Sequence, residues 1–241
     1  VKENHADCLL FYRMGDFYEM FFKDAVDAAA ALDITLTKRG KVEDIDVPMC
    51  GVPVHAAESY LSRLIRKGFR VAICEQTESP EEAKKRGHKG PLTRDVIRIV
   101  TPGTLVEDEF LPPRENNFLV ALAEVKSAGL NDRYALSWVD LSTGDFFTET
   151  VRPDRIEETL ARLGAAELII SDHPDLGADL DFNLSKSDEA GLVGSMSARP
   201  ARLFDSKEGA RSLCAVYGVK NLDGIAALSS AAIAAAVALV P

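Results

Sequence analysis

Apolar and polar residues alternate over several short stretches of the first hundred residues, and two longer stretches have helical spacing. The alternation predicts strands at Cys8–Met14, Phe69–Glu75 and Asp95–Val100. Lys23–Leu32 is rich in alanine and contains neither glycine nor proline, so we predict a helix there.

A second helix is predicted over His55–Lys67, because its apolar residues recur every three or four positions and Gly68 follows its last turn. Ile34–Thr37 alternates and predicts a further short strand. Strands interspersed with helices in this way are typical of an α/β domain with a mixed sheet.

The second half of the chain shows a clearer order of elements. We predict strands at Phe118–Val125, Tyr134–Leu141 and Asp145–Val151, a helix at Pro153–Leu163, a strand at Glu167–Ser171, and helices at Lys207–Tyr217 and Leu222–Val240. Three antiparallel strands followed by a helix and another strand resemble the ribonuclease-H-like arrangement. The expected fold class is therefore mixed α/β in both halves.

The stretch Glu107–Asn117 separates the two halves. It is strongly charged and contains Pro112-Pro113, which disfavours both helix and sheet. We therefore predict a first domain over residues 1–107, a linker over 108–117 and a second domain over 118–241. The chain begins at Val1 rather than methionine and stops at Pro241 directly after an apolar stretch, so we interpret it as part of a longer protein.

The composition is that of a globular protein, with 46% hydrophobic and 27% charged residues. No apolar run reaches the roughly 20 residues that span a bilayer, and no signal-peptide pattern is present, so we expect no membrane as a partner. The four cysteines are far apart and the four histidines lack metal-ligand spacing, so we expect neither disulfides nor a metal site. These features favour a cytoplasmic protein.

The net charge of −10 is distributed unevenly. Residues 1–107 hold 16 Lys and Arg against 17 Asp and Glu, whereas residues 108–241 hold 12 against 21, which leaves −1 and −9. A DNA-binding surface needs local positive charge rather than a basic total. The first half has such clusters, at residues 38–41, 63–70 and 84–98, although charge alone equally suits ordinary solvated surfaces.

The most informative segment follows the turn predicted at Gly15-Asp16. If Phe17–Phe22 is extended, the even-numbered residues share one wholly apolar face and the odd-numbered residues share the other. Glu19 lies on the odd face, and a carboxylate is rarely buried without a partner. We therefore predict that this face is at least partly open and that Phe17 is an exposed aromatic residue beside an exposed acid.

An exposed phenylalanine near basic clusters can enter a DNA base step and kink the duplex. Opening a step costs least where the base is mismatched or damaged, so such a wedge detects a poor base pair without reading a sequence. Glu19 would be repelled by phosphates and compensated only by a hydrogen bond to a displaced base, which makes it a specificity device. By pattern alone, a core Phe17 and an edge-strand charge at Glu19 are the favoured explanation of these residues.

Five sequence blocks resemble the mismatch-binding domain of the MutS family. They are Gly15-Asp16-Phe17-Tyr18-Glu19 and the segments 32–40, 47–56, 71–76 and 98–104, in one order over about a hundred residues. The resemblance implies that Phe17 is the stacking wedge and Glu19 the base contact of the family's Phe-x-Glu motif. MutS-like proteins outside mismatch repair generally lack this pair. Met14, Arg39 and Met49 match further family positions near the DNA, and Cys50 replaces a common alanine.

The second half is similar to the ribonuclease-H-like connector domain of the same family, most clearly over Leu136–Gly144 and Ser197–Arg211. The resemblance implies a relay between domains and contact with a MutL-type partner. It also implies mismatched double-stranded DNA as a ligand, a homodimer at full length and a nucleoid-associated protein. In the family, ATP and Mg²⁺ bind an ATPase domain outside this chain. This sequence has no phosphate-binding loop, so we expect no cofactor and no enzyme activity in it.

Two other functions remain open from the residues. Glu124, Asp140 and Asp145 fall on or near adjacent predicted strands and could hold Mg²⁺ in a metal-dependent nuclease, although solvated strand-end acids explain them as well. A protein-interaction module without DNA specificity would use the aromatic segment to contact a partner and would bind matched and mismatched duplexes equally.

Overall fold

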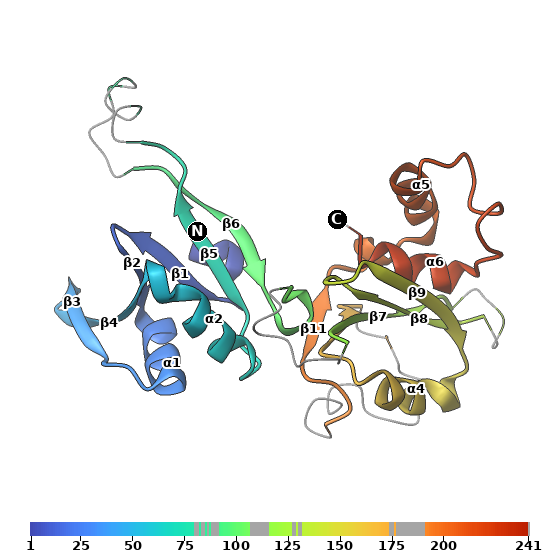
Figure 1. The fold of residues 1–241 in the computed structure, drawn as a ribbon, viewed down its shortest axis with the longest axis horizontal. Coiled ribbons are helices and arrows are strands. Elements are labelled where there is room, and N and C mark those ends of the chain that lie inside the picture. The colour runs from blue at the N-terminus through green and yellow to red at the C-terminus, as the bar shows by residue number, and fades with distance from the viewer. Residues whose placement is uncertain are drawn as a thin grey trace. The chain divides into compact units, whose positions relative to one another are not determined.

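The computed structural model describes residues 1–79, 92–106, 116–126, 132–173 and 191–240, together with residues 82, 85, 87, 129 and 176. The chain forms two compact units, Val1–Thr101 and Pro102–Pro241 (Figure 1). Most of the predicted linker, residues 108–115, lies outside the described residues. Within the described part of the chain, no helix is both long and apolar enough to cross a membrane.

The first unit is built on a six-stranded sheet in the order β3-β4-β2-β1-β5-β6. Its strands are β1 (Leu9–Met14), β2 (Phe17–Phe21), β3 (Thr37–Val42), β4 (Ile45–Pro53), β5 (Val71–Gln76) and β6 (Arg94–Val100). Strands β1 and β5 are parallel and the other neighbours antiparallel, which confirms the predicted mixed sheet. A short helical turn, η1 (Lys2–His5), precedes it.

Helices α1 (Phe22–Leu32) and α2 (Ala57–Ile65) contact one another and pack against this sheet, α2 following the turn η2 (Val54–Ala56). Their contact face buries Tyr18 and Met20 of β2, and the Cys50 thiol of β4 donates to the Ala25 carbonyl of α1 at 3.4 Å. Burial raises the pKa of Cys50 to about 11. One face of the sheet is therefore the core of the unit.

The structure corrects two predictions in this unit. Phe22 does not continue the strand, because its φ of +54° turns the chain into α1 and leaves the ring 57% exposed. The strand predicted at Ile34–Thr37 is also wrong, since β3 begins only at Thr37 and pairs with β4. The β3–β4 hairpin turns at Glu43 and Asp44, both with positive φ. Pairing with β2 forms β4 despite Pro48, which local pattern did not indicate.

The second unit contains a five-stranded sheet in the order β11-β10-β7-β8-β9. Its strands are β7 (Phe118–Glu124), β8 (Tyr134–Asp140), β9 (Asp145–Val151), β10 (Glu167–Ser171) and β11 (Met196–Arg199). Strands β7, β8 and β9 are antiparallel, and β10 is parallel to both β7 and β11. This order is consistent with the predicted ribonuclease-H-like arrangement, although β11 was not predicted.

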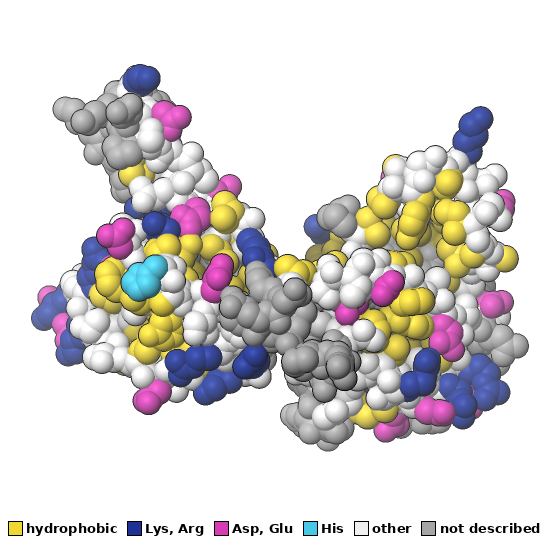
Figure 2. Space-filling view, in the orientation of Figure 1, with side chains coloured by type: hydrophobic (Ala, Val, Ile, Leu, Met, Phe, Trp, Pro, Cys, Tyr) yellow, Lys and Arg dark blue, Asp and Glu magenta, His cyan; other side chains and the backbone are white. Residues whose placement is uncertain are grey.

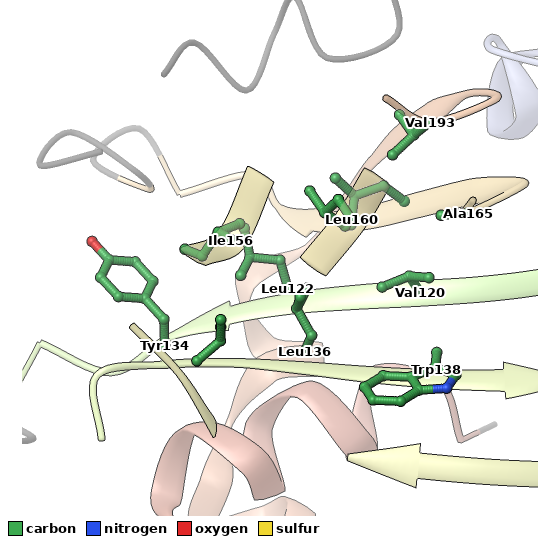
Figure 3. Packing of buried hydrophobic residues seen from close by; sticks show 11 residues of the cluster. Val120, Leu122, Tyr134, Leu136, Trp138, Ile156, Leu160, Ala165 and Val193 are labelled. Atoms are coloured by element: carbon green, nitrogen blue, oxygen red, sulfur yellow. The ribbon is translucent and has the colours of Figure 1, made fainter. Parts of the chain in front are cut away.

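The central strands of this second sheet are buried on both faces, whereas most residues of the edge strand β9 are exposed or partly exposed. On one face, Leu122 and Leu136 pack against Ile156 and Leu160 of α4 (Ile156–Leu163), which follows the turn η4 (Pro153–Arg155) (Figure 3). On the other face, small residues of β7 and β8 pack against α6 (Ser230–Val237), itself in contact with α5 (Ser206–Tyr217). The turn η6 (Ala201–Phe204) precedes α5. The helix predicted over Leu222–Val240 is shorter, because Ser229 caps α6 by accepting from Ala232 N.

Residues 102–105 belong to the second unit, so the compact units divide a few residues before the domain boundary predicted at 107. Gly103, in the turn η3 (Pro102–Thr104), donates its amide to the buried Glu167 carboxylate at 3.3 Å. A Cβ at Gly103 would lie 2.7 Å from a methyl carbon of Leu119, so only glycine fits this close approach. The Asn117 side-chain amide donates to the Pro102 and Leu105 carbonyls and ties the segment to β7.

Candidate nucleic-acid interface

The face of the first sheet opposite α1 and α2 brings four predicted site residues together. Strand register pairs Met14 with Phe17, and Glu19 with Gly51, while Met49 lies two positions along β4 from Gly51. An ideal Cβ on Gly51 would lie 3.9 Å from a ring carbon of Phe17 and 3.7 Å from Cγ of Glu19. Met14, Phe17, Glu19 and Met49 therefore share one face, which we call the open face.

Phe17 projects from the turn end of β2. Gly15 has a φ of +59°, a backbone conformation that residues with a side chain rarely adopt. This conformation lets the chain reverse tightly from β1 into β2. The Phe17 side chain is 47% exposed, whereas Tyr18 is 8% exposed and Met20 is fully buried. The predicted alternation between an apolar buried face and a face that exposes Phe17 is confirmed for these residues, but the prediction of an exposed acid beside Phe17 is wrong, because the Glu19 side chain is only 14% exposed.

Glu19 carries a specific partner on the open face. Arg39 Nη1 of β3 donates to Glu19 Oε2, and their side chains are 48% and 14% exposed. The pairing places a positive charge beside the carboxylate that would otherwise repel DNA phosphates. Arg39, which the resemblance placed near the DNA without indicating a partner, is thereby brought from 20 positions away in sequence to the side of Glu19.

Further basic side chains surround this area. At the left edge of Figure 2 they lie over the β3–β4 hairpin, interspersed with acidic ones. Lys38 Nζ pairs with Asp46 Oδ2 at 2.5 Å, with both side chains more than 40% exposed. Of the cluster predicted over residues 84–98, Lys84, Arg86 and Lys89 lie outside the described residues.

Sequence reasoning missed the polar residues behind the wedge. The Tyr18 hydroxyl donates to Glu75 Oε1 of β5, and Arg13 Nη1 lies 3.6 Å from the same oxygen. Burial first, then the hydrogen bond and the charge of Glu75, raise the pKa of Tyr18, so its hydroxyl stays protonated as a donor. Arg94 of β6 donates to the Arg13 carbonyl at 3.0 Å. A direct signal was lacking, because these contacts join strands more than 50 residues apart.

The three acids of the nuclease alternative do not converge. Register places Glu124 opposite Tyr134 and Asp140 opposite Phe118, at the two ends of the β7–β8 ladder and roughly 20 Å apart. Glu124 accepts from Arg133 at 2.6 Å. Among the residues that the structure describes, no three His, Cys, Asp or Glu side chains are placed to share a metal ion.

Asp140 has a structural role instead. It accepts hydrogen bonds from Asn117 N at 3.0 Å, Ser142 N at 2.9 Å and Ser142 Oγ at 2.6 Å, which closes the turn between β8 and β9. Burial by itself raises the pKa of this carboxyl, but the hydrogen bonds outweigh burial and hold the pKa below its ordinary value. Asp145 accepts from the Thr143 hydroxyl in the same turn.

Comparison with known proteins agrees with this arrangement of two units. The family models described as MutS domain I and MutS domain II match residues 1–109 and 117–240. The chain belongs to the MutS family. The MutS domain I match covers the first unit, in which Phe17 and Glu19 lie on the open face and Arg39 pairs with Glu19.

Curated relatives named "DNA mismatch repair protein MutS" are about 50% identical to the chain over the aligned residues. The protein of Ruegeria pomeroyi is 52% identical over 246 residues, and that of Rhizobium meliloti is 49% identical over 245. The protein of Dinoroseobacter shibae is 50% identical over 240 residues. Each comparison covers 100% of this chain but only 26% of the relative, so the chain spans about a quarter of their length.

Proposed function

We propose that the open face recognises mismatched double-stranded DNA in mismatch repair. The observation that supports this proposal is the exposure of Phe17 at the start of β2. Its aromatic ring is half-exposed, whereas the next residue, Tyr18, is buried. A ring fixed to a six-stranded sheet can enter a base step without the loss of side-chain freedom that a flexible residue would suffer. Met14 and Met49 would add apolar contact beside it, and Arg39 would contact the DNA backbone.

Glu19 would provide discrimination in this proposal. Its ion pair with Arg39 offsets the charge that intact duplex would repel. At a mismatch, a displaced base offers a hydrogen-bonding partner that matched DNA keeps within the stack, so the carboxylate gains a contact only there. The names of the curated relatives support the biological setting, DNA mismatch repair.

The remaining proposals concern the whole protein. We propose that the second unit relays the DNA-bound state to other domains and to a MutL-type partner, and that the full-length protein acts as a cytoplasmic, nucleoid-associated homodimer. ATP and Mg²⁺ would bind elsewhere in that protein, and we assign them to no residue of this chain. We assign the chain itself no enzymatic step.

The test compares Phe17→Ala with Phe147→Ala in the complete gene product that carries this sequence. Phe147 is a matched control, since it is 48% exposed and lies on β9 of the second unit. Dissociation constants are measured at one moderate salt concentration for a matched duplex, a G·T duplex and a one-base-bulge duplex. We expect Phe17→Ala to lose mismatch preference by on the order of tenfold or more, and Phe147→Ala to retain it.

Equal binding of both duplex types by the unsubstituted protein would contradict the proposal and favour a protein-interaction module. Retention of the preference in Phe17→Ala would show that the ring is not the wedge. If the preference depends on Phe17, Glu19→Gln is measured next, and we expect it to change mismatch affinity more than matched affinity.

A further inference from the structure

A row of polar side chains crosses the first sheet directly behind the wedge. Arg13 and Tyr18 are cross-strand partners on β1 and β2, and Glu75 lies beside Arg13 on β5, since the preceding residues Tyr12 and Cys74 pair. The next row toward the turn contains Met14 and Phe17. Tyr18 therefore directly follows Phe17 on β2, and Arg13 directly precedes Met14, the cross-strand partner of Phe17, on β1.

Arg13 connects this row to the turn that carries Phe17. Its Nε donates to the Gly15 carbonyl at 2.5 Å, its Nη1 lies 3.6 Å from Glu75 Oε1, and its guanidinium carbon lies 5.6 Å from the centre of the Tyr18 ring. A guanidinium can make these three contacts together because it is planar and has donors on several edges. The Arg13 and Glu75 side chains are each 25% exposed.

The other carbonyl of the turn is also held. Val54 N, at the start of η2, donates to the Asp16 carbonyl at 2.9 Å. The Gly15 and Asp16 carbonyls thus each accept a hydrogen bond, the first from a side chain of β1 and the second from the backbone of η2. Of these two partners, only Arg13 can be altered by substitution without changing the backbone.

We propose that Arg13, Tyr18 and Glu75 are positioning residues that hold the Gly15-Asp16 turn, and with it Phe17, in the orientation required to enter a base step. This inference rests on the proposed function of Phe17. A wedge has to be stiffer than the step that it opens, because otherwise the ring is displaced and the base stays stacked. Binding groups held loosely by their supporting residues lose affinity even when every contact residue is present.

The second unit contains a cluster of the same composition without a wedge. Arg133 Nη2 pairs with Glu124 at 2.6 Å, the Tyr134 hydroxyl donates to Glu124 at 3.2 Å, and the Arg133 guanidinium carbon lies 5.5 Å from the Tyr134 ring centre. Substitutions in this second cluster remove the same types of contact. They therefore serve as matched controls for general effects on folding.

The experiment compares Arg13→Lys, Tyr18→Phe and Glu75→Gln with Arg133→Lys, Tyr134→Phe and Glu124→Gln in the complete gene product. Arg13→Lys keeps the charge but cannot make the three contacts together, and Tyr18→Phe keeps the ring that packs against Phe11. The readouts are the ratio of matched to mismatched dissociation constants, the salt dependence of matched binding and the folded fraction by circular dichroism. Phe17→Ala is measured in the same series.

We expect Arg13→Lys and Glu75→Gln to lower the ratio on the order of tenfold, with matched binding and its salt dependence preserved. Tyr18→Phe and Glu75→Gln combined should lower the ratio less than the sum of their separate effects, because Tyr18→Phe removes the hydrogen bond between these two residues and Glu75→Gln weakens the same bond by removing the charge of its acceptor. The three substitutions in the second unit should leave the ratio unchanged.

Three results would overturn the inference. In the first, Phe17→Ala reduces the ratio to about one, while the Arg13, Tyr18 and Glu75 variants keep the ratio of the unsubstituted protein. Phe17 would then act as a wedge without support from these three residues. In the second, both duplexes weaken equally and the salt dependence falls, which identifies Arg13 as a phosphate contact. In the third, both sets of variants lower the ratio alike, which shows a general folding effect. Retention of the ratio in Phe17→Ala contradicts the proposed function itself.

Discussion

The two sheets of the molecule differ in how many of their faces are covered. The central strands of the second unit's sheet are covered on both faces, by α4 on one and by α6 on the other, and all seven residues of β8 are buried, although Phe147 of the edge strand β9 is 48% exposed. The sheet of the first unit has its helices on one face, and its opposite face carries a half-exposed phenylalanine. A sheet that is stable with one face covered can present rigid side chains on the other. This difference locates the candidate site.

The clusters of Arg, Tyr and Glu sharpen the comparison. Both units contain one, with guanidinium-to-ring distances of 5.6 and 5.5 Å. In the first unit, Arg13 also donates to the Gly15 carbonyl in the turn before Phe17. In the second unit, Arg133 directly precedes Tyr134, the first residue of β8. The same set of residue types therefore acquires a functional meaning only from its neighbours.

The largest effects are expected in the second sheet, where neighbouring residues on opposite faces should both be costly to truncate. Leu168 is fully buried on the α4 side, and Ile169 is 7% exposed on the other side. Leu168→Ala and Ile169→Ala should each lower the free energy of unfolding by about 2–5 kcal/mol. Chemical denaturation followed by fluorescence of Trp138, the only tryptophan, measures this unit. A cost near zero for Ile169→Ala would show that its face is not covered.

In the first sheet the same comparison should be unequal. Met20→Ala removes a fully buried side chain and should lower the free energy of unfolding by about 2–5 kcal/mol. Phe17→Ala, on the opposite face of the same strand, should lower it by at most roughly 1 kcal/mol, because about half of the ring is already exposed. Amide hydrogen exchange in β1 and β2 measures both. Equal costs would mean that Phe17 belongs to the core.

A smaller, pH-dependent effect is expected at Asp140. Because its folded-state pKa lies below the ordinary value of 3.8, the ionised carboxyl stabilises the second unit above that pH, and this contribution is lost as the pH falls below it. Asp140→Asn should lower the free energy of unfolding by about 1–3 kcal/mol at pH 7, since buried donors lose their acceptor.

Denaturation, followed by Trp138 fluorescence, is repeated at pH values from 7 down to 3. The difference in the free energy of unfolding between Asp140→Asn and the unsubstituted chain should become smaller as the pH falls. Asp154→Asn is the control, since that side chain is 61% exposed. A difference that stays constant over this range would contradict the assignment of the stabilisation to the Asp140 carboxylate.

Much of the fold was predictable where local pattern and tertiary contact agree. Glu167–Ser171 and Asp145–Val151 form strands with the predicted bounds, and Gly164 ends the predicted helix in a left-handed conformation. Predictions were wrong where pairing overrides local preference. The hairpin of β3 and β4 contains Gly40 and Pro48, which disfavour strands. It forms because β4 pairs with β2 along its other edge.

The candidate site was predictable only as far as alternation within one strand assigns residues to its two faces. Alternation in β2 separates Phe17 and Glu19 from Tyr18 and Met20 because successive side chains of any strand point to opposite faces. Alternation alone does not say which face a helix covers. That assignment required α1 and α2, whose packing follows from the whole chain.

The sequence by itself determined the class of the fold, the resemblance to the MutS family and the choice of Phe17 and Glu19 as candidate residues, because these depend on the order of residues along the chain. Only the tertiary structure decided that Arg39 pairs with Glu19, that Arg13 contacts both the Gly15 carbonyl and Glu75, and that Glu124 and Asp140 lie at opposite ends of a ladder. Those relations depend on which strands pair and in which register, and pairing is decided by the sheet as a whole rather than by any single segment.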